Sequence, residues 1–138
     1  MTARIPKHNS DPARPGFSLV ELMIAVAVVA ILVTLSYPAF IHYVLKADRT
    51  DAQMELQDWA NRQEVWRADH PAYSTGINPS DTENYTYSMV STADSFTLTA
   101  TAIGRQAADE EEGLSCATLT LRQDGSPGPA GYLACWAK

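Results

Sequence analysis

Cysteine and histidine are scarce in this chain, which has 138 residues but only two Cys and three His. Two cysteines are too few for a zinc ribbon or an iron–sulfur cluster. The sequence shows no Ser/His/Asp or Cys/His arrangement and no metal-ligand spacing, and neither His42 nor His70 is placed to act as a base. We therefore expect no enzymatic activity, no cofactor and no metal site.

Positive charge is also in short supply. Lys and Arg together number 10 against 16 Asp and Glu, which gives a formal net charge of -6. The imbalance lies in residues 17–138, which carry a net charge of -8, whereas residues 1–16 carry +2. Because proteins bind the phosphate backbone mainly through Lys and Arg, we expect no direct binding of nucleic acid.

Charge is almost absent from residues 17–40, where Glu21 is the only charged residue among 24. As a helix at about 1.5 Å per residue, this segment would extend over roughly 36 Å, enough to cross a hydrocarbon core of about 30 Å. The basic leader, residues 1–16, precedes it, and Lys and Arg before a span keep that end of the chain in the cytoplasm. The pattern predicts a single membrane-spanning segment, with the remaining residues outside the cytoplasm.

Helix-breaking residues are missing from residues 41–69, which contain no Pro or Gly. Apolar residues recur there mostly at steps of three, four or seven, the spacing of one helix face, and Arg49 and most other charges fall elsewhere. We expect an amphipathic helix that continues the apolar one, is kinked by Pro38 and ends near Asp69. The members of the apolar stripe are Ile41, Val44, Leu45, Ala52, Leu56, Trp59 and Trp66.

Residues 70–138 contain six of the seven Gly and most of the Thr, with alternating apolar and polar positions. Such alternation is typical of strands that bury one face. We predict an α+β fold with one core, in which a long N-terminal helix packs on an antiparallel sheet of three or four strands. The strand-like runs are 85–90, 95–103, 116–122 and 132–136, with a hairpin turn at 91–94.

Four consecutive acids, Asp109–Glu112, stand just before Gly113. Such a run is typical of a solvated loop, and we expect one here. A calcium site is the alternative, because calcium takes spaced oxygen ligands beside a turn glycine.

The junction at Gly16 and Phe17 is the most specific feature of the chain. A secretory signal peptide is cut after its apolar core, whereas a plausible cutting site here lies before the core. A lone carboxylate such as Glu21 in a membrane span costs about 2.5–3.5 kcal/mol and needs a partner. A cut after Gly16 would create an amine on Phe17, and that amine on a neighbouring subunit is the better partner for Glu21. The plain alternative is a single-pass anchor in which Glu21 is a tolerated polar residue.

The run G-F-S-L-V-E-L-M-I at 16–24 closely resembles the prepilin motif of the type IV pilin family. Pro38 matches the helix-kinking proline of that family, and Cys116 with Cys135 matches its closing disulfide. The run C-A-T-L-T-L at 116–121 and the terminal Cys-Trp pair look most like PilE-type minor pilins.

The resemblance implies a structural subunit of the type IV pilus. A prepilin peptidase would cut between Gly16 and Phe17 and methylate the Phe17 amine, and Glu21 would pair with that amine in the filament. The partners implied are other pilin subunits, the prepilin peptidase, the membrane and the inner-membrane assembly machinery. The subunit would lie in the bacterial inner membrane before assembly and in the extracellular pilus afterwards.

Two residues depart from the family pattern, and alternatives are open for the disulfide and for the function. Pro15 stands where the family more often has a basic residue, and Ala30 stands where many members have a helix-loosening glycine. A disulfide is expected because thiols outside the cytoplasm tend to oxidise, the alternative being two unpaired buried thiols. A pseudopilin of the type II secretion system is the nearest functional alternative, since it uses the same N-terminal motif. The other functional alternatives are a membrane-anchored enzyme and a DNA-uptake pilin, since the negative charge argues against direct DNA contact by this subunit but not against membership of a DNA-uptake filament.

Overall fold

The computed structural model describes residues 16–136. These residues fall into two compact units, one ending at Tyr37 and the other beginning at Pro38. The expected leader lies outside the described residues except for Gly16. The expected functional division into segments 17–40, 41–69 and 70–138 stays a prediction.

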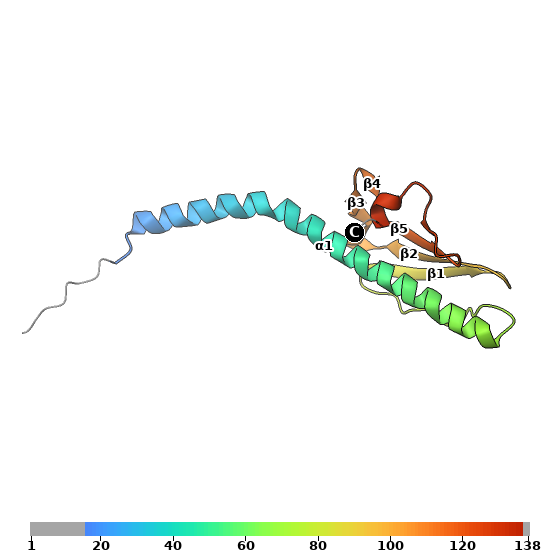
Figure 1. Cartoon of the computed structure of the whole chain (residues 1–138). Helices are drawn as coiled ribbons and strands as arrows, with labels where there is room; N and C mark the ends of the chain where they lie inside the picture. The colour runs from blue at the N-terminus through green and yellow to red at the C-terminus, as the bar shows by residue number, and fades with distance from the viewer. Residues whose placement is uncertain (1–15, 137–138) are drawn as a thin grey trace, which may run out of the picture. The chain divides into compact units, whose positions relative to one another are not determined.

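Helix α1 (Leu19–Asp69) is one helical element of 51 residues and passes through Pro38 (Figure 1). At its start, the backbone N–H of Glu21 donates to Ser18 Oγ at 3.1 Å. This is the hydrogen bond that a serine at the N-cap position accepts. At its end, Pro71 follows within two residues and cannot continue a helix. The predicted helix end near Asp69 is confirmed, whereas the predicted kink at Pro38 stays a prediction.

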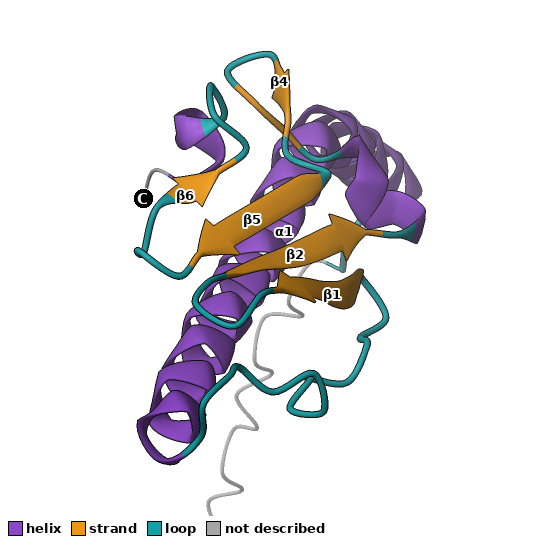
Figure 2. Ribbon diagram, turned by 90° about the vertical axis from the view of Figure 1, so that its right-hand side faces the viewer, coloured by secondary structure: helices purple, strands orange, loops and turns teal. Residues whose placement is uncertain are grey.

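The second unit contains a four-stranded antiparallel sheet in the order β1-β2-β5-β6 (Figure 2). In the β1–β2 hairpin, the Thr92 N–H donates to the Ser95 carbonyl at 2.8 Å, which closes the turn expected at 91–94. The predicted α+β fold, a long helix on an antiparallel sheet, is confirmed. The strands are β1 (Tyr85–Ser91), β2 (Phe96–Ala102), β5 (Thr118–Arg122) and β6 (Pro127–Gly128).

The last predicted strand, 132–136, is wrong. These residues contain a 3₁₀ helix, η2 (Leu133–Trp136), in which the Cys135 N–H donates to the Tyr132 carbonyl at 3.0 Å. The fourth strand is instead β6, a Pro-Gly pair. Proline and glycine are both rare in strand interiors, so the sequence pattern conceals this strand.

A second, two-stranded ribbon pairs β3 (Glu110–Glu111) with β4 (Leu114–Ser115). Its turn places Gly113 at a φ of 77°, the left-handed region that glycine adopts without strain. The 3₁₀ helix η1 (Gly104–Ala108) leads into this ribbon from β2. Strand β3 of this ribbon lies within the acidic run that we expected to be a solvated loop.

The core of the second unit joins the apolar stripe of α1 to the inner face of the sheet. Leu56 and Trp59 from the helix and Leu98 and Leu119 from the strands are completely buried. Each such side chain contributes about 1.5–3 kcal/mol on burial. Figure 2 shows the helix running behind the sheet, so that one helix face covers one sheet face.

The disulfide Cys116–Cys135 joins the segment before β5 to η2, and both cysteines are buried. The predicted pairing is therefore confirmed. Its position ties the C-terminal turn to the sheet.

Candidate functional site

The N-terminal junction presents its predicted residues at the surface. Gly16 and Phe17 are exposed and precede the helix, and Glu21 lies in the first turn of α1. A carboxylate in the first turn interacts favourably with the positive end of the helix dipole. Within the described part of the chain, no side chain forms a salt bridge with Glu21. Its carboxylate is therefore free to meet a group from another molecule.

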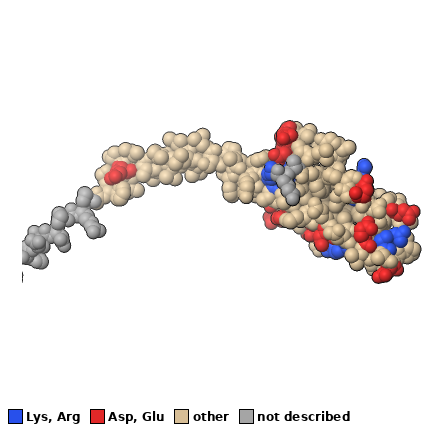
Figure 3. Space-filling view, viewed as in Figure 1, with Lys and Arg blue, Asp and Glu red and all other residues tan. Residues whose placement is uncertain are grey.

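The apolar part of α1 is exposed along its whole length before Pro38. It contains an 18-residue window with a mean hydropathy of 2.6, none of it buried inside the protein, and it is the one described helix long and apolar enough to cross a membrane. In Figure 3 this segment is tan with a single acidic patch, which matches Glu21 as its only charge. Such a surface needs an apolar environment outside its own chain.

A buried ion pair fastens α1 to the ribbon. The Arg49 guanidinium donates through Nη1 to both carboxylate oxygens of Asp109, at 3.1 and 3.2 Å, and both residues are at most 1% exposed. Nη2 of Arg49 also binds the Glu111 carboxylate, and Lys46 Nζ lies 3.5 Å from the same carboxylate. The helical pattern of the sequence predicts Arg49 on the polar face of the helix. Arg49 is buried instead, so this prediction is wrong.

The pKa values of the Asp109 and Glu111 carboxyls shift in opposite directions, each for a different reason. Burial raises the pKa of Asp109 above its ordinary value, and the neighbouring Arg49 acts in the opposite direction. The hydrogen bond from Arg49 lowers the pKa of Glu111. The expectation of a solvated acidic loop is wrong for these two residues, because a buried cation sixty residues earlier binds them both.

Gln106 extends the buried polar network. Its Nε2 donates to the Leu45 carbonyl at 2.9 Å and to the Tyr85 hydroxyl oxygen at 3.0 Å. Burial raises the pKa of Tyr85 to about 12, so the phenol stays protonated at neutral pH. The network joins helix, sheet and ribbon through neutral and paired groups, without a reactive centre.

Gln63 fastens the loop that follows the helix. Its Nε2 donates to the Ser74 carbonyl at 2.8 Å, and its Oε1 accepts from the Ser74 N–H at 2.9 Å. Gln63 is completely buried, so these two hydrogen bonds satisfy polar groups that water does not reach. The sequence pattern missed Gln63 because an isolated glutamine carries no signal of burial.

The predicted site residues come together only in part. Cys116 and Cys135 form a bond, whereas Gly16, Phe17, Glu21 and Pro38 lie along one helix and the residues that lead into it. Among residues 16–136, no group of three or more His, Cys, Asp or Glu is arranged to hold a metal ion. Asp109 and Glu111, the core of the calcium alternative, bind Arg49 instead.

Two family models match this chain. The model described as "Type IV minor pilin ComP, DNA uptake sequence receptor" matches residues 38–120, and the prokaryotic N-terminal methylation motif matches residues 12–37. Together they cover the apolar helix, the amphipathic helix and most of the sheet.

Two curated proteins, a fimbrial protein and a type IV major pilin, have similar sequences. The chain is 29% identical to the fimbrial protein EcpC of Eikenella corrodens over 120 residues, which is 80% of this chain and 77% of EcpC. It is 31% identical to the type IV major pilin protein PilA of Myxococcus xanthus over 75 residues, or 54% of this chain. That alignment spans only a third of the length of PilA (33%).

A solved structure has a similar fold. The type IV pilin from Shewanella oneidensis superimposes with a TM-score of 0.56 at 29% sequence identity, covering 68% of this chain and 99% of the other.

Proposed function

This chain belongs to the type IV pilin family, as a minor pilin of the ComP type with the N-terminal methylation motif, and from that premise we propose how its parts act. Pilins are structural subunits, so the prediction that the chain is not an enzyme is confirmed. We propose that a prepilin peptidase cuts between Gly16 and Phe17 and methylates the new amine. The finer likeness to PilE-type minor pilins stays a prediction.

The observation that carries the proposal is an exposed apolar helix with a single acid near its start. Residues 17–40 would lie in the inner membrane before assembly, with the leader in the cytoplasm. The same surface would then pack against other subunits in the filament. One segment can serve in both places because each environment is apolar.

Glu21 would set the register between subunits. A charge buried without a partner is strongly penalised, so the apolar segment would settle where Glu21 meets the Phe17 amine of a neighbour. A displacement along the helix axis would separate the two charges. The exposed position of Glu21, with no salt bridge to the described residues, supports this pairing between molecules.

A comparison of two variants tests this role. Glu21→Ala should leave the subunit in the membrane and remove it from sheared filaments. Asp69→Ala removes an exposed acid at the far end of α1 and should be incorporated normally. Incorporation of Glu21→Ala at the level of the unaltered chain would contradict the pairing, whatever the total amount of filament.

The pilus is favoured over the type II secretion filament. A calcium site in the acidic run would favour the secretion alternative, but Arg49 binds two of those acids. Calcium should therefore not raise the free energy of unfolding of the second unit. Stabilisation by calcium that is lost on replacing the acids of the run by Ala would favour the pseudopilin.

A second candidate function is that of a DNA receptor. The matching family model carries the description "DNA uptake sequence receptor", which conflicts with our expectation of no direct nucleic-acid binding. That expectation used the summed net charge of residues 17–138, and a net charge does not report how individual cations are distributed. Among the described residues, Arg105 and Arg122 are exposed and form no salt bridge, so they are available to meet phosphates.

Selection from a random-sequence duplex pool at low salt tests this second function. A receptor should enrich one motif, and Arg122→Ala should weaken binding and reduce the salt slope by about 1 if that residue contacts a phosphate. Arg62→Ala is the control, because Arg62 is already paired with Glu55 and Asp58. A pool that shows neither enrichment nor binding would exclude direct DNA contact.

A further inference from the structure

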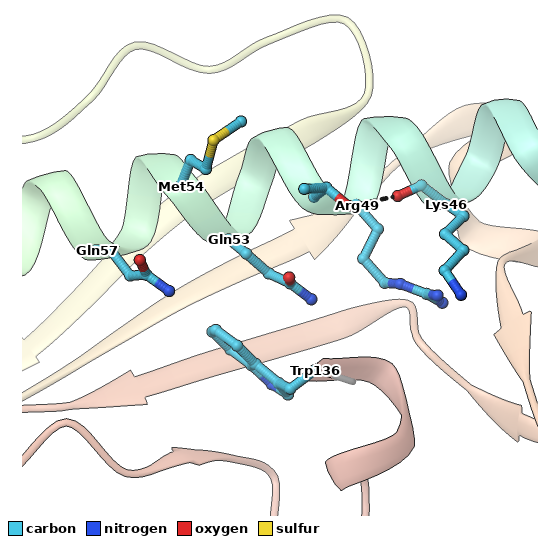
Figure 4. Close-up of a pocket in the computed structure, with 7 residues that line it drawn as sticks. Lys46, Arg49, Gln53, Met54, Gln57 and Trp136 are labelled. Carbon is cyan, nitrogen blue, oxygen red and sulfur yellow. Dashed lines mark hydrogen bonds between the residues drawn. The ribbon is translucent and has the colours of Figure 1, made fainter. Parts of the chain in front are cut away.

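A groove of about 530 Å³ lies beside α1 in the second unit, with Trp136 of η2 among the residues that line it. Its polar walls include Lys46, Gln53 and Gln57, which together span about three turns of the helix. Figure 4 shows the two glutamines extending from the helix toward the side on which Trp136 lies. The groove is thus lined by side-chain amides together with apolar surface from the indole ring and Met54.

The indole of Trp136 is held in a fixed place. Its Nε1 donates to the Gly128 carbonyl at 3.0 Å, and the preceding residue, Cys135, is held by the disulfide. Gln53 provides a third contact that holds this segment, because its Nε2 donates to the Cys135 carbonyl at 2.7 Å. A half-buried aromatic ring fixed by these contacts offers its face without a large loss of conformational entropy on binding.

The amides supply donors and acceptors beside that ring. Gln53 and Gln57 are four residues apart, so they occupy one face of the helix. Gln57 is exposed and makes no side-chain hydrogen bond to any residue of the described chain, and Gln53 Oε1 is also without a donor there. Three polar atoms therefore remain for a ligand.

The charges at the end of the groove cancel. Lys46 and Arg49 carry two positive charges, and Asp109 and Glu111, which bind them, carry two negative charges. Arg49 is also only 1% exposed, so it presents no free cation to an anion. This arrangement does not attract a phosphate backbone, and it suits a neutral ligand rich in hydroxyl groups.

We propose that this groove binds a neutral carbohydrate. One apolar face of a pyranose ring would stack on the Trp136 indole, and its hydroxyls would bind the free amide atoms of Gln53 and Gln57. Lys46 would donate to a further hydroxyl at the groove's end. The proposal requires neither DNA binding nor filament assembly, so its failure would leave the pilin function intact.

The test uses the full chain in a detergent without a sugar headgroup, such as a zwitterionic amine oxide. The probes are lactose, galactose, N-acetylglucosamine and chitobiose, followed by saturation-transfer NMR and tryptophan fluorescence. At least one sugar should bind saturably. Gln57→Ala should weaken it by roughly tenfold, the effect of losing one or two hydrogen bonds. Trp136→Ala should abolish it.

Two controls keep the proposal falsifiable if Trp136→Ala disturbs the fold. Gln57 is exposed and unbonded, so Gln57→Ala should fold normally and still weaken binding. Asn61→Ala, an exposed residue one turn further on the same helix, should bind as the unaltered chain does. The proposal is overturned if no sugar binds, if Gln57→Ala binds unchanged, or if only a single-stranded oligodeoxyadenylate occupies the groove.

Discussion

The guanidinium of Arg49 donates to both carboxylate oxygens of Asp109, and this fully buried pair joins the helix to the ribbon. A buried ion pair is not a strong source of stability in itself, because desolvation offsets its attraction. Its importance lies in its position. It fixes how the segment between β2 and β5 docks on α1, and therefore where Cys116 begins its path to the disulfide, since the Cys116 N–H donates to the Asp109 carbonyl at 2.8 Å.

Removing one partner of this pair should destabilise the protein strongly. We expect Arg49→Met to lower the free energy of unfolding by about 3–5 kcal/mol, because it leaves a buried carboxylate uncompensated. The double variant Arg49→Met with Asp109→Leu should recover most of this loss. Arg62→Ala, which removes an exposed pair, should change stability by less than about 1 kcal/mol. Denaturant unfolding of the full chain in detergent measures all of them, and equal effects of Arg49→Met and Arg62→Ala would contradict the account.

Glu111 should make the protein sensitive to acid. Arg49 lowers the pKa of Glu111 in the folded state, so its contribution is complete above the ordinary carboxyl pKa and is lost as pH falls through the lowered value. Burial raises the pKa of Asp109, so Asp109 contributes a pH dependence of opposite sign. Because the compared chains all keep Asp109, the difference between their stability curves reports the contribution of Glu111. When the pH is lowered from about 5 to about 3, we expect the free energy of unfolding of Glu111→Gln to fall by less than that of the unaltered chain. The exposed neighbour Glu110→Gln should follow the unaltered chain, and a Glu111→Gln curve parallel to it would refute the prediction.

The loop after the helix should depend on Gln63. Gln63→Ala removes both hydrogen bonds to Ser74 and leaves the backbone N–H and carbonyl of this half-buried residue without their partner, at a cost of about 1–3 kcal/mol. The loss should appear as faster proteolysis and hydrogen exchange within residues 70–84. Asn61→Ala lies on the exposed face of the same helix and should leave both rates unchanged. Unaltered rates in Gln63→Ala would show that the loop is held by other contacts.

The disulfide should stabilise the second unit. It closes a loop with a sequence separation of 19, for which the chain-entropy model gives about 3 kcal/mol. The double variant Cys116→Ser with Cys135→Ser should unfold at lower denaturant than the oxidised chain, and reductant should have no further effect on it. Equal midpoints for the oxidised chain and the double variant would contradict this prediction.

The sequence predicts the elements whose signal is local. The apolar stripe at helical spacing ends at Trp66, shortly before the helix ends at Asp69, and alternating Thr and apolar residues mark β2. Both elements are therefore predicted from their own residues. The strand β6 is hidden because its two residues are Pro and Gly. The residues of η2 form a short apolar run that resembles a strand in sequence, but they are held by the disulfide and by the hydrogen bonds that Gln53 and Trp136 donate.

The polar interior is harder to predict, because its signal is not local. Arg49 interrupts an apolar stripe, and only the acids sixty residues later explain why it is buried. The acidic run looks uniform in sequence, yet Asp109 is buried and Glu110 is exposed. Which acid faces Arg49 depends on the pairing of β3 with β4, and no periodic pattern records two-residue strands.

The most direct test is the intact mass of this polypeptide in sheared surface filaments. The account predicts a chain that begins at Phe17, carries one methyl group on its amine, contains the Cys116–Cys135 bond and is less abundant than the main pilin. A chain that is absent from filaments and keeps residues 1–16 in the membrane would contradict processing at Gly16 and incorporation through α1.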